Sequence, residues 1–343
     1  MARLKLFAKH CANLVLALYG YARIKTTNTP TLLILNYHRV LPTSHPDREN
    51  EQPGMVVSPE RLKAHIQLVK QVGYVPMDLD SWVTAYTRNQ DLPDKAVAFT
   101  FDDGWRDNYE FAWPVLKEEQ VPATVFLVTN LVGTMKEFWP EQILRLLTSH
   151  LVPLEGDAFA WLRPFLPQHR LPESVSGLSL SDADNVVLEL KAMTDQAIYA
   201  GLDQIYSTHP DLRPSPESRA ILNSSELDEM SSGDLVSFGA HTRNHFRLNR
   251  LETDSDVERE IVGCLEDLKR ITASAVPIFC YPNGDITDSG KQLVASHYHA
   301  ACTTKIGWNR AGCSPFDLHR FNLHDGNSYN SRRLLATIGR GLL

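Results

Sequence analysis

The sequence lacks a hydrophobic run that could cross a bilayer as a helix. Its apolar stretch from Leu14 to Tyr21 covers eight positions, whereas a membrane-spanning helix needs about 20 consecutive apolar residues. A secretory signal peptide is also disfavoured, because Lys9 and His10 interrupt the apolar region that such a peptide requires. These absences favour a cytoplasmic location for the chain.

Cysteine is scarce, and no two cysteines have the spacing of a zinc finger or of a CxxC redox motif. The five cysteines are Cys11, Cys264, Cys280, Cys302 and Cys313. An odd number of widely spaced thiols is typical of a protein that stays reduced. We therefore expect free cysteines, which again favours the cytoplasm.

Acidic residues are absent before Asp47, although the same stretch carries six Lys and Arg residues. The whole chain nevertheless has a net charge of -7, which argues against nucleic acid as a partner. Residues 1–28 are predicted to form a basic amphipathic helix, because apolar residues recur at spacings of three and four. Such a helix either makes a peripheral contact with the inner face of a membrane or packs against the body of the protein. The sequence does not decide between these interpretations, and it leaves the oligomeric state open.

Short apolar runs that alternate with helical patterns predict an α/β fold with parallel strands. The expected strands are 31–40, 96–101, 122–128, 235–240, 277–281, 300–303 and 318–321. Between 134 and 223 the alternation stops, and the apolar pattern predicts a largely helical insertion. We therefore interpret 29–133 and 224–343 as one barrel-like unit that the insertion 134–223 interrupts.

Two adjacent carboxylates, Asp102 and Asp103, follow the strand at 96–101 and precede Gly104. This strand is apolar on both sides, which fits a buried strand of a parallel sheet. Two carboxylates cannot lie in the middle of such a strand, so they are expected at its carboxyl end, where α/β enzymes place their catalytic groups. Considered alone, the pair fits a strand end followed by a helix cap equally well.

A second polar cluster follows the strand at 235–240, where His241 and His245 are four residues apart. This spacing predicts that both imidazoles lie on one side of a helical turn and reach one metal ion. One carboxylate would complete a three-ligand set with open positions, which suits a catalytic zinc or similar metal. The other aspartate would be free to take a proton from the attacking water.

These motifs resemble those of the NodB-like polysaccharide deacetylases, the family 4 carbohydrate esterases. Residues 100–104 (TFDDG) are similar to the first family motif, and residues 241–245 (HTRNH) fit the second, H-[ST]-x-x-H. Residues 279–284 (FCYPNG) resemble the third in its YP-x-G variant. The resemblance covers about 32–133 and 224–321, and it implies a distorted (β/α)7 barrel of the NodB-homology type.

The resemblance also implies a role for each site residue. Asp102 would be the general base. The backbone N–H of Asn283, in the motif that contains Tyr281, would help to stabilise the oxyanion and contact the substrate. A divalent metal is expected, with zinc as the first candidate and cobalt or nickel as alternatives. Its ligands would be Asp103, His241 and His245.

The sequence departs from the family pattern at the arginine that commonly begins the third motif and orients the base. Cys280 stands at that position here. We expect Arg320, in the sequence Leu318-His319-Arg320, to substitute for the missing guanidinium.

A second departure concerns the general acid, which the family commonly takes from a late Leu-x-His motif. Only Leu323-His324 resembles that motif. In a subgroup that acts on poly-β-1,6-N-acetylglucosamine an early Tyr-His pair supplies the acid instead, and Tyr37-His38 is similar to that pair. His38 is therefore our first candidate for the acid that protonates the leaving amine, and His324 is the reserve.

The resemblance implies a carbohydrate deacetylase, a hydrolase of linear amides. It would remove N-acetyl groups from amino sugars of a bacterial-type polysaccharide or its glycolipid precursor, through attack by metal-activated water with Asp102 as the base. Three alternatives remain: a deformylase or other amidase acting on a lipid-linked monosaccharide, a non-catalytic glycan-binding barrel, and a sugar isomerase on a similar barrel. The isomerase would usually need a more carboxylate-rich metal site and a lysine or histidine base, which the sequence does not supply. A non-catalytic barrel would normally lack the base or a ligand, whereas all four of these residues are present.

Overall fold

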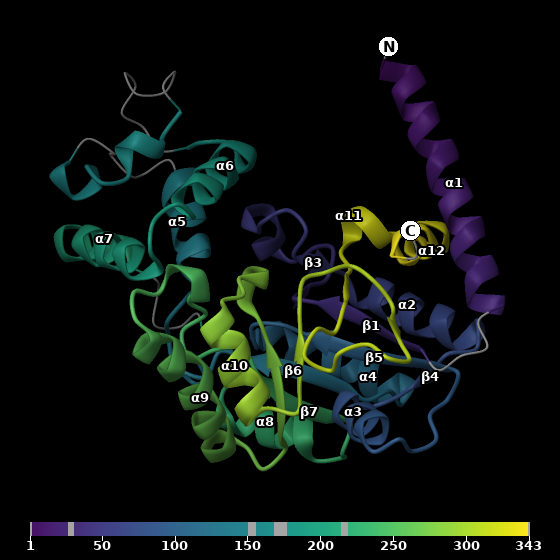
Figure 1. Cartoon of the computed structure of the whole chain (residues 1–343). Helices are drawn as coiled ribbons and strands as arrows, with labels where there is room; N and C mark the ends of the chain where they lie inside the picture. Colours follow the sequence, from purple (N-terminus) through teal and green to yellow (C-terminus); the bar gives the residue numbers. More distant parts are fainter. Residues whose placement is uncertain (1, 27–30, 150–155, 168–176, 214–218, 342–343) are drawn as a thin grey trace.

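A curled, mostly parallel sheet forms the centre of the computed structural model, which describes residues 2–26, 31–149, 156–167, 177–213 and 219–341 (Figure 1). The sheet has the order β10-β1-β5-β6-β7-β8-β9, with β4 beside β5 and β11 beside β1. Every pair is parallel except β1 with β10. The strands are β1 (Thr31–Tyr37), β4 (Val75–Pro76), β5 (Lys95–Phe101), β6 (Ala123–Leu127), β7 (Val236–Ala240), β8 (Ala275–Cys280), β9 (Ala300–Cys302), β10 (Asn309–Arg310) and β11 (Phe321–Asn322). A separate parallel pair is formed by β2 (Arg39–Val40) and β3 (Val56–Val57).

A short segment of the chain, 318–322, connects the two ends of the curled sheet. Leu318 forms a parallel bridge with Cys302 in β9, and the two residues of β11 pair in parallel with β1. The order around the sheet is therefore β1, β5, β6, β7, β8, β9 and this segment. The predicted α/β fold, a distorted barrel built mainly of parallel strands, is confirmed.

The central strands are buried on both faces, as their continuous apolar character predicts. In β1, Leu33 and Leu35 belong to the core that packs against the surrounding helices. Leu32 and Ile34 point the other way and join a second core with Trp82 of α3 (Leu79–Thr87). Because side chains alternate along a strand, Asn36 continues the row of Leu32 and Ile34, and it reaches the interior at the carboxyl end of β1.

Helices surround the sheet (Figure 1). Their starts follow local capping chemistry. At α2, for example, the Ser58 hydroxyl accepts a hydrogen bond from the backbone N–H of Arg61, and Pro59 occupies the first helical position. The helices of the barrel unit are α2 (Pro59–Gln71), α3 (Leu79–Thr87), α4 (Trp113–Glu119), α8 (Ser224–Ser231), α9 (Asp254–Ile271), α10 (Asp288–His297), α11 (Asp325–Ser328) and α12 (Ser331–Arg340). Single turns are η1 (Pro46–Asn50), η2 (Asn108–Ala112), η7 (Leu248–Arg250) and η8 (Pro282–Gly284).

A group of helices between β6 and β7 has an apolar core of its own, which includes Phe159, Val187 and Leu202. Its elements are α5 (Trp139–Thr148), η3 (Asp157–Phe159), η4 (Arg163–Phe165), α6 (Leu180–Leu190), α7 (Asp195–Thr208) and η6 (Pro210–Leu212). A buried ion pair attaches this group to the barrel, since Arg247 Nη2 lies 3.0 Å from Asp195 Oδ1. The described part of 134–223 is therefore largely helical, whereas its status as an insertion with boundaries at 134 and 223 stays a prediction. Residues 150–155, 168–176 and 214–218 of that range lie outside the described residues.

The N-terminal helix α1 (Ala2–Thr26) lies against α12 (Figure 1). Gly20 and Gly339 permit the close approach of the two helices. A Cβ atom on Gly20 would lie 2.6 Å from the carbonyl oxygen of Leu335, and one on Gly339 would lie 2.4 Å from that of Leu16. Residues 1, 27 and 28 of the predicted N-terminal unit lie outside the described residues. Among the described helices, none combines the length and apolar character that crossing a membrane requires.

Candidate active site

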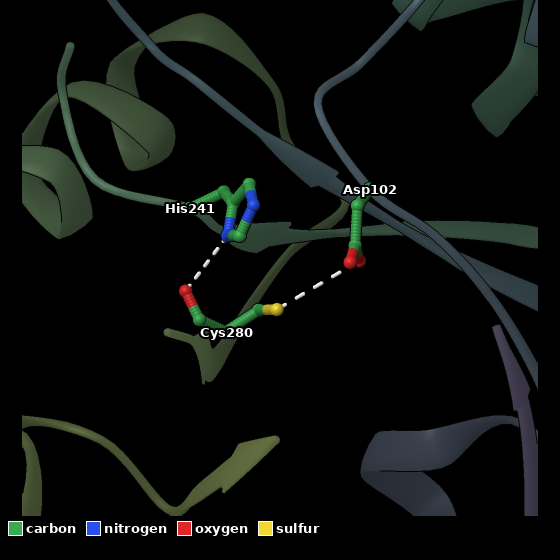
Figure 2. A group of neighbouring side chains, drawn as sticks. All are labelled: Asp102, His241 and Cys280. Carbon is green, nitrogen blue, oxygen red and sulfur yellow. Dashed lines mark hydrogen bonds between the residues drawn. The ribbon is translucent and has the colours of Figure 1, made fainter. Parts of the chain in front are cut away.

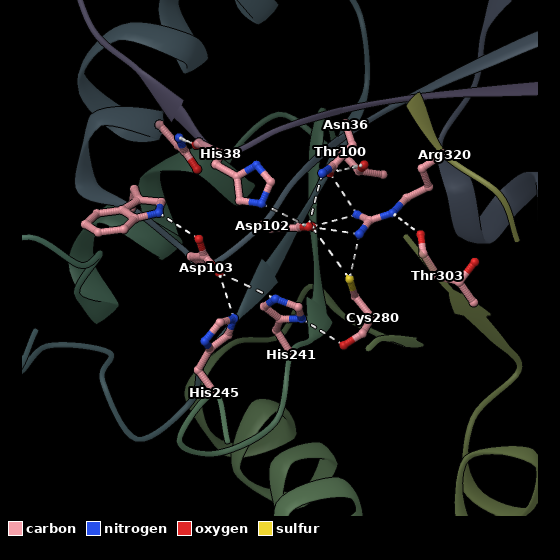
Figure 3. Close-up of polar contacts among 12 residues, drawn as sticks. Asn36, His38, Thr100, Asp102, Asp103, His241, His245, Cys280, Thr303 and Arg320 are labelled. Carbon is pink, nitrogen blue, oxygen red and sulfur yellow. Dashed lines mark hydrogen bonds and ion pairs between the residues drawn. The ribbon is translucent and has the colours of Figure 1, made fainter. Parts of the chain in front are cut away.

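Six of the sequence-predicted site residues meet at the carboxyl ends of the strands (Figure 3): His38, Asp102, Asp103, His241, His245 and Arg320. Asp102 and Asp103 follow β5 and are 3% and 4% exposed. His241 follows β7, and Cys280 ends β8. Parallel strands bring their carboxyl ends to one edge of a sheet, so residues from separate parts of the chain lie within contact distance.

Asp103, His241 and His245 form a compact set of potential metal ligands. The Oδ1 atom of Asp103 lies 3.5 Å from Nε2 of His241 and 3.4 Å from Nε2 of His245. The three ligand atoms lie within 4.8 Å of one another. One carboxylate and two imidazoles are a donor set suited to zinc or a similar divalent ion with open positions.

Neighbouring groups fix the orientation of these ligands. The Nδ1 atom of His241 is 2.7 Å from the carbonyl oxygen of Cys280 (Figure 2). In the tautomer with Nδ1–H donating to that carbonyl, Nε2 carries the free lone pair. The indole N–H of Trp105 donates to Oδ2 of Asp103 at 2.9 Å, so Oδ1 is the oxygen that faces both histidines. Arg39 in turn stacks on Trp105, with its guanidinium carbon 4.5 Å from the ring centroid.

The electrostatic environment also favours cation binding. Burial would raise the pKa of Asp103, but hydrogen bonding with His241 and the nearby histidine charges hold it well below its usual range. Burial lowers the pKa of His245 to about 4, so its ring is neutral at pH 7. Burial would also lower the pKa of His241, yet Cys280 and Asp103 raise it well above its ordinary value. A cation that binds here would therefore displace a proton from His241.

The backbone around the histidines differs from the predicted helical turn. Residues 241–247 form an irregular loop, and Thr242 and His245 have left-handed φ angles of 62° and 59°. The prediction of a helical turn was wrong. The two rings nevertheless meet, because the left-handed residues fold the loop back towards Asp103.

Asp102 is held by a buried guanidinium rather than by the metal-ligand set (Figure 3). Arg320 donates from Nη1 to Oδ1 of Asp102 at 2.7 Å and from Nη2 to Oδ2 at 2.9 Å. The Nε–H of Arg320 donates to the carbonyl oxygen of Thr303 at 3.1 Å. Burial would raise the pKa of Asp102, but the charges of Arg320, His241 and His38 hold it below its ordinary value. Asp102 is therefore ionised at pH 7, as a base must be.

The contact of Arg320 with Asp102 agrees with its predicted substitution for the missing motif arginine. Arg320 comes from the segment between β9 and β1 that closes the sheet. Its Nη2 also lies 3.1 Å from Sγ of Cys280, so the small thiol leaves room for a guanidinium that arrives from another strand. The Cys280 Sγ is 3.7 Å from Oδ1 of Asp102 (Figure 2).

A second donor set, formed by Asp102, His241 and Cys280, is also compact enough to hold a cation. The guanidinium of Arg320 contacts both oxygens of Asp102 and the sulfur of Cys280. A cation there would be repelled by this buried positive charge. The set that contains Asp103 and His245 is therefore the better metal site.

His38 and His324, the two candidate acids, lie in different surroundings. Nε2 of His38 is 3.7 Å from Oδ2 of Asp102, and its side chain is 19% exposed. Its Nδ1 has no hydrogen-bond partner among the described residues. By contrast, Nδ1 of His324 caps α11 by accepting a hydrogen bond from the backbone N–H of Gly326 at 3.1 Å. The geometry favours His38 as the residue available for proton transfer.

Tyr281 and Asn283 form no hydrogen bond with Asp102 or Asp103 in the described part of the chain. Tyr281 is 1% exposed, and its ring packs edge-on against Phe279 in the core. Its backbone N–H donates to the carbonyl oxygen of Cys302. Asn283 is exposed, has a left-handed φ of 54°, and accepts a hydrogen bond from Lys191 of the helical insertion. The Tyr281 side chain therefore belongs to the core, and the proposed oxyanion role of Asn283 stays a prediction.

The sequence interpretation missed Asn36 and Trp105. Asn36 donates to Oδ2 of Asp102 at 3.1 Å, and its own Oδ1 accepts from Arg320 Nη1 and Thr100 Oγ1, each at 2.8 Å. A polar residue in an otherwise apolar interior row of β1 was the signal that could have identified it. For Trp105, which follows the TFDDG motif directly, the sequence offers no comparable signal.

Comparisons with known proteins agree with this geometry. The family model described as polysaccharide deacetylase matches residues 89–154 and 208–301. The chain is 32% identical over 109 residues to the poly-β-1,6-N-acetyl-D-glucosamine N-deacetylase of Staphylococcus epidermidis, covering 30% of this chain and 37% of that protein. The chain spans about half or less of the length of the curated relatives it matches.

Two solved structures share the fold. The deacetylase PplD of Streptococcus pyogenes, in complex with acetate, has a TM-score of 0.57 at 20% identity, covering 91% of this chain and 99% of that one. IcaB from Ammonifex degensii has a TM-score of 0.56 at 17% identity, covering 90% and 97%. At these identities the similarity concerns the fold alone.

Proposed function

Because the chain belongs to the polysaccharide deacetylase family, whose members are hydrolases of amide bonds, we propose that it is a metal-dependent deacetylase of N-acetylated amino sugars. One observation carries the proposal. A three-residue donor set for a divalent ion lies directly beside a buried, ionised carboxylate that Arg320 and Asn36 orient. The proposed substrate class is a β-1,6-linked N-acetylglucosamine polymer, in view of the name of the staphylococcal relative.

The chain's own residues can divide the reaction between two protein groups. A divalent ion held by Asp103, His241 and His245 would polarise the amide carbonyl and lower the pKa of water. Asp102, ionised and fixed by Arg320, is positioned to accept a proton from the attacking water. His38, whose Nε2 lies 3.7 Å from Oδ2 of Asp102, would donate a proton to the leaving amine. The products are acetate and a free amino sugar.

Acetate release from β-1,6-linked N-acetylglucosamine oligomers tests the proposal. We expect hydrolysis with added zinc, cobalt or nickel and none with a chelator, because the donor set has open positions for a catalytic ion. N-formylated sugars and lipid-linked monosaccharides serve as competing substrates, and faster release from these would favour the amidase alternative. Failure to bind metal, with no hydrolysis of any of these substrates, would refute the enzymatic function and favour a glycan-binding barrel.

Replacing His38 and His324 separately by alanine tests the assignment of the acid. We expect His38→Ala to lower kcat about 100-fold or more while metal content stays unchanged. The same change at His324 removes a helix cap, so it should lower the free energy of unfolding by about 1 kcal/mol and leave kcat close to that of the wild type. A large loss of kcat in His324→Ala with little change in His38→Ala would instead identify His324 as the general acid.

A further inference from the structure

One face of α1 is covered by the body of the protein. Its buried residues Asn13, Ala17, Gly20 and Ile24 recur at spacings of three and four and form a single stripe. The stripe lies against α12, where the two glycines allow close contact. On this side, the helix therefore packs against the body of the protein, which is one of the two interpretations that the sequence left open.

The other face of α1 is also apolar, and within the described structure it is exposed. Leu14, Val15, Leu18 and Tyr21 are 40%, 65%, 61% and 44% exposed. These residues lie within two helical turns and together form one continuous surface, which we call the outer face of α1. Isolated exposed apolar residues are common in soluble proteins, but a contiguous exposed row usually marks an interaction surface.

The charge of α1 indicates what this surface contacts. The helix contains five basic residues and no Asp or Glu. The basic residues are Arg3, Lys5, Lys9, Arg23 and Lys25. A second copy of the chain that packed outer face to outer face would bring two such clusters together, and like charges repel. A surface of anionic lipid headgroups over an apolar layer complements both the charge and the apolar row.

We propose that the outer face of α1 binds the surface of an anionic membrane, with the helix lying in the plane of the interface. Leu14, Val15 and Leu18 enter the boundary between headgroups and acyl chains, and the net positive charge of the helix attracts it to the anionic headgroups. The opposite face stays on α12, so the barrel is held at the membrane surface. This binding does not depend on the proposed catalytic function.

Co-sedimentation of the full chain with lipid vesicles tests the proposal. Vesicles of phosphatidylcholine with about one third phosphatidylglycerol should bind the protein, vesicles of phosphatidylcholine alone should bind it much less, and salt should weaken the binding. The double variant Val15→Gln with Leu18→Gln should weaken binding to the anionic vesicles about tenfold or more, because two aliphatic side chains no longer enter the apolar layer.

The chain offers a matched control, since Leu188 and Ile306 are apolar residues outside α1 that are 53% and 62% exposed. Replacing these two by glutamine should leave vesicle binding unchanged, and a loss equal to that of the α1 variant would overturn the proposal. Absence of wild-type binding to anionic vesicles would also overturn it. So would a lipid-free dimer that the α1 substitutions dissociate, because the outer face would then be an interface between two copies. Circular dichroism confirms that each variant is folded.

Discussion

Asp102→Asn is expected to lower kcat by about 100-fold to 10,000-fold, the range typical of a lost general base. The amide matches the carboxylate in shape, and its oxygen can still accept one of the two hydrogen bonds from Arg320. It cannot take up a proton from the attacking water. Metal content, measured by elemental analysis of the purified protein, should stay equal to that of the wild type, because the ligand set lies on the neighbouring residue Asp103.

Asp103→Asn is the matched comparison, since it makes the same chemical change one residue along the chain. It should reduce bound metal as well as kcat, because it removes the only carboxylate of the ligand set. Metal content therefore distinguishes the two roles: it should stay unchanged when the base Asp102 is replaced and fall when the ligand Asp103 is replaced. Loss of metal in Asp102→Asn but not in Asp103→Asn would reverse the assignment of the two carboxylates.

Arg320→Met is expected to have the largest effect on stability. It leaves Asp102 buried without its guanidinium, and breaking a buried ion pair by removing one partner costs about 3–5 kcal/mol. Urea denaturation at pH 7 measures this loss as a change in the free energy of unfolding. Arg310→Met, at an exposed arginine of β10, is the control and should change the free energy of unfolding by about 0.5 kcal/mol or less.

The same variant should change the pH dependence in a defined direction. In the wild type the pKa of Asp102 is below its ordinary value, so this carboxylate stabilises the fold above its unfolded pKa, and the contribution is lost as the pH falls through the folded pKa. In Arg320→Met burial is no longer opposed by the guanidinium, and the pKa of Asp102 rises. The difference in the free energy of unfolding between the wild type and Arg320→Met should then become smaller as the pH falls through this raised pKa. The acid limb of the kcat/KM profile should move to higher pH.

A rescue experiment checks that the guanidinium acts through Asp102. The double variant Cys280→Arg with Arg320→Ala returns an arginine to the position that the family motif commonly uses. Cys280 Sγ lies 3.7 Å from Oδ1 of Asp102, so a guanidinium from this position can reach the carboxylate. Partial recovery of kcat/KM and of the acid limb, relative to Arg320→Ala alone, is the expected result. An unchanged acid limb in Arg320→Met would contradict the positioning role of Arg320.

Local pattern was sufficient to predict the strand ends that carry the chemistry. The strand before Asp102 is apolar on both sides, and a buried parallel strand has room for two carboxylates only where it emerges from the sheet. The same reasoning placed His241 at the end of β7. These predictions succeeded because they depend on burial and on the two-residue period of a strand, which neighbouring residues in the sequence determine.

The sequence by itself determined which residue types stand at the carboxyl ends of the strands, because hydrophobic patterning is local. Only the tertiary structure decided which of them touch. Arg320 meets Asp102 across a separation of 218 residues, and it does so because the segment between β9 and β1 closes the sheet. Asn36 joins them from β1, and the left-handed backbone at Thr242 and His245 replaces the expected helical turn. Such contacts depend on strand pairing over long distances and on loop conformations that no local periodicity encodes.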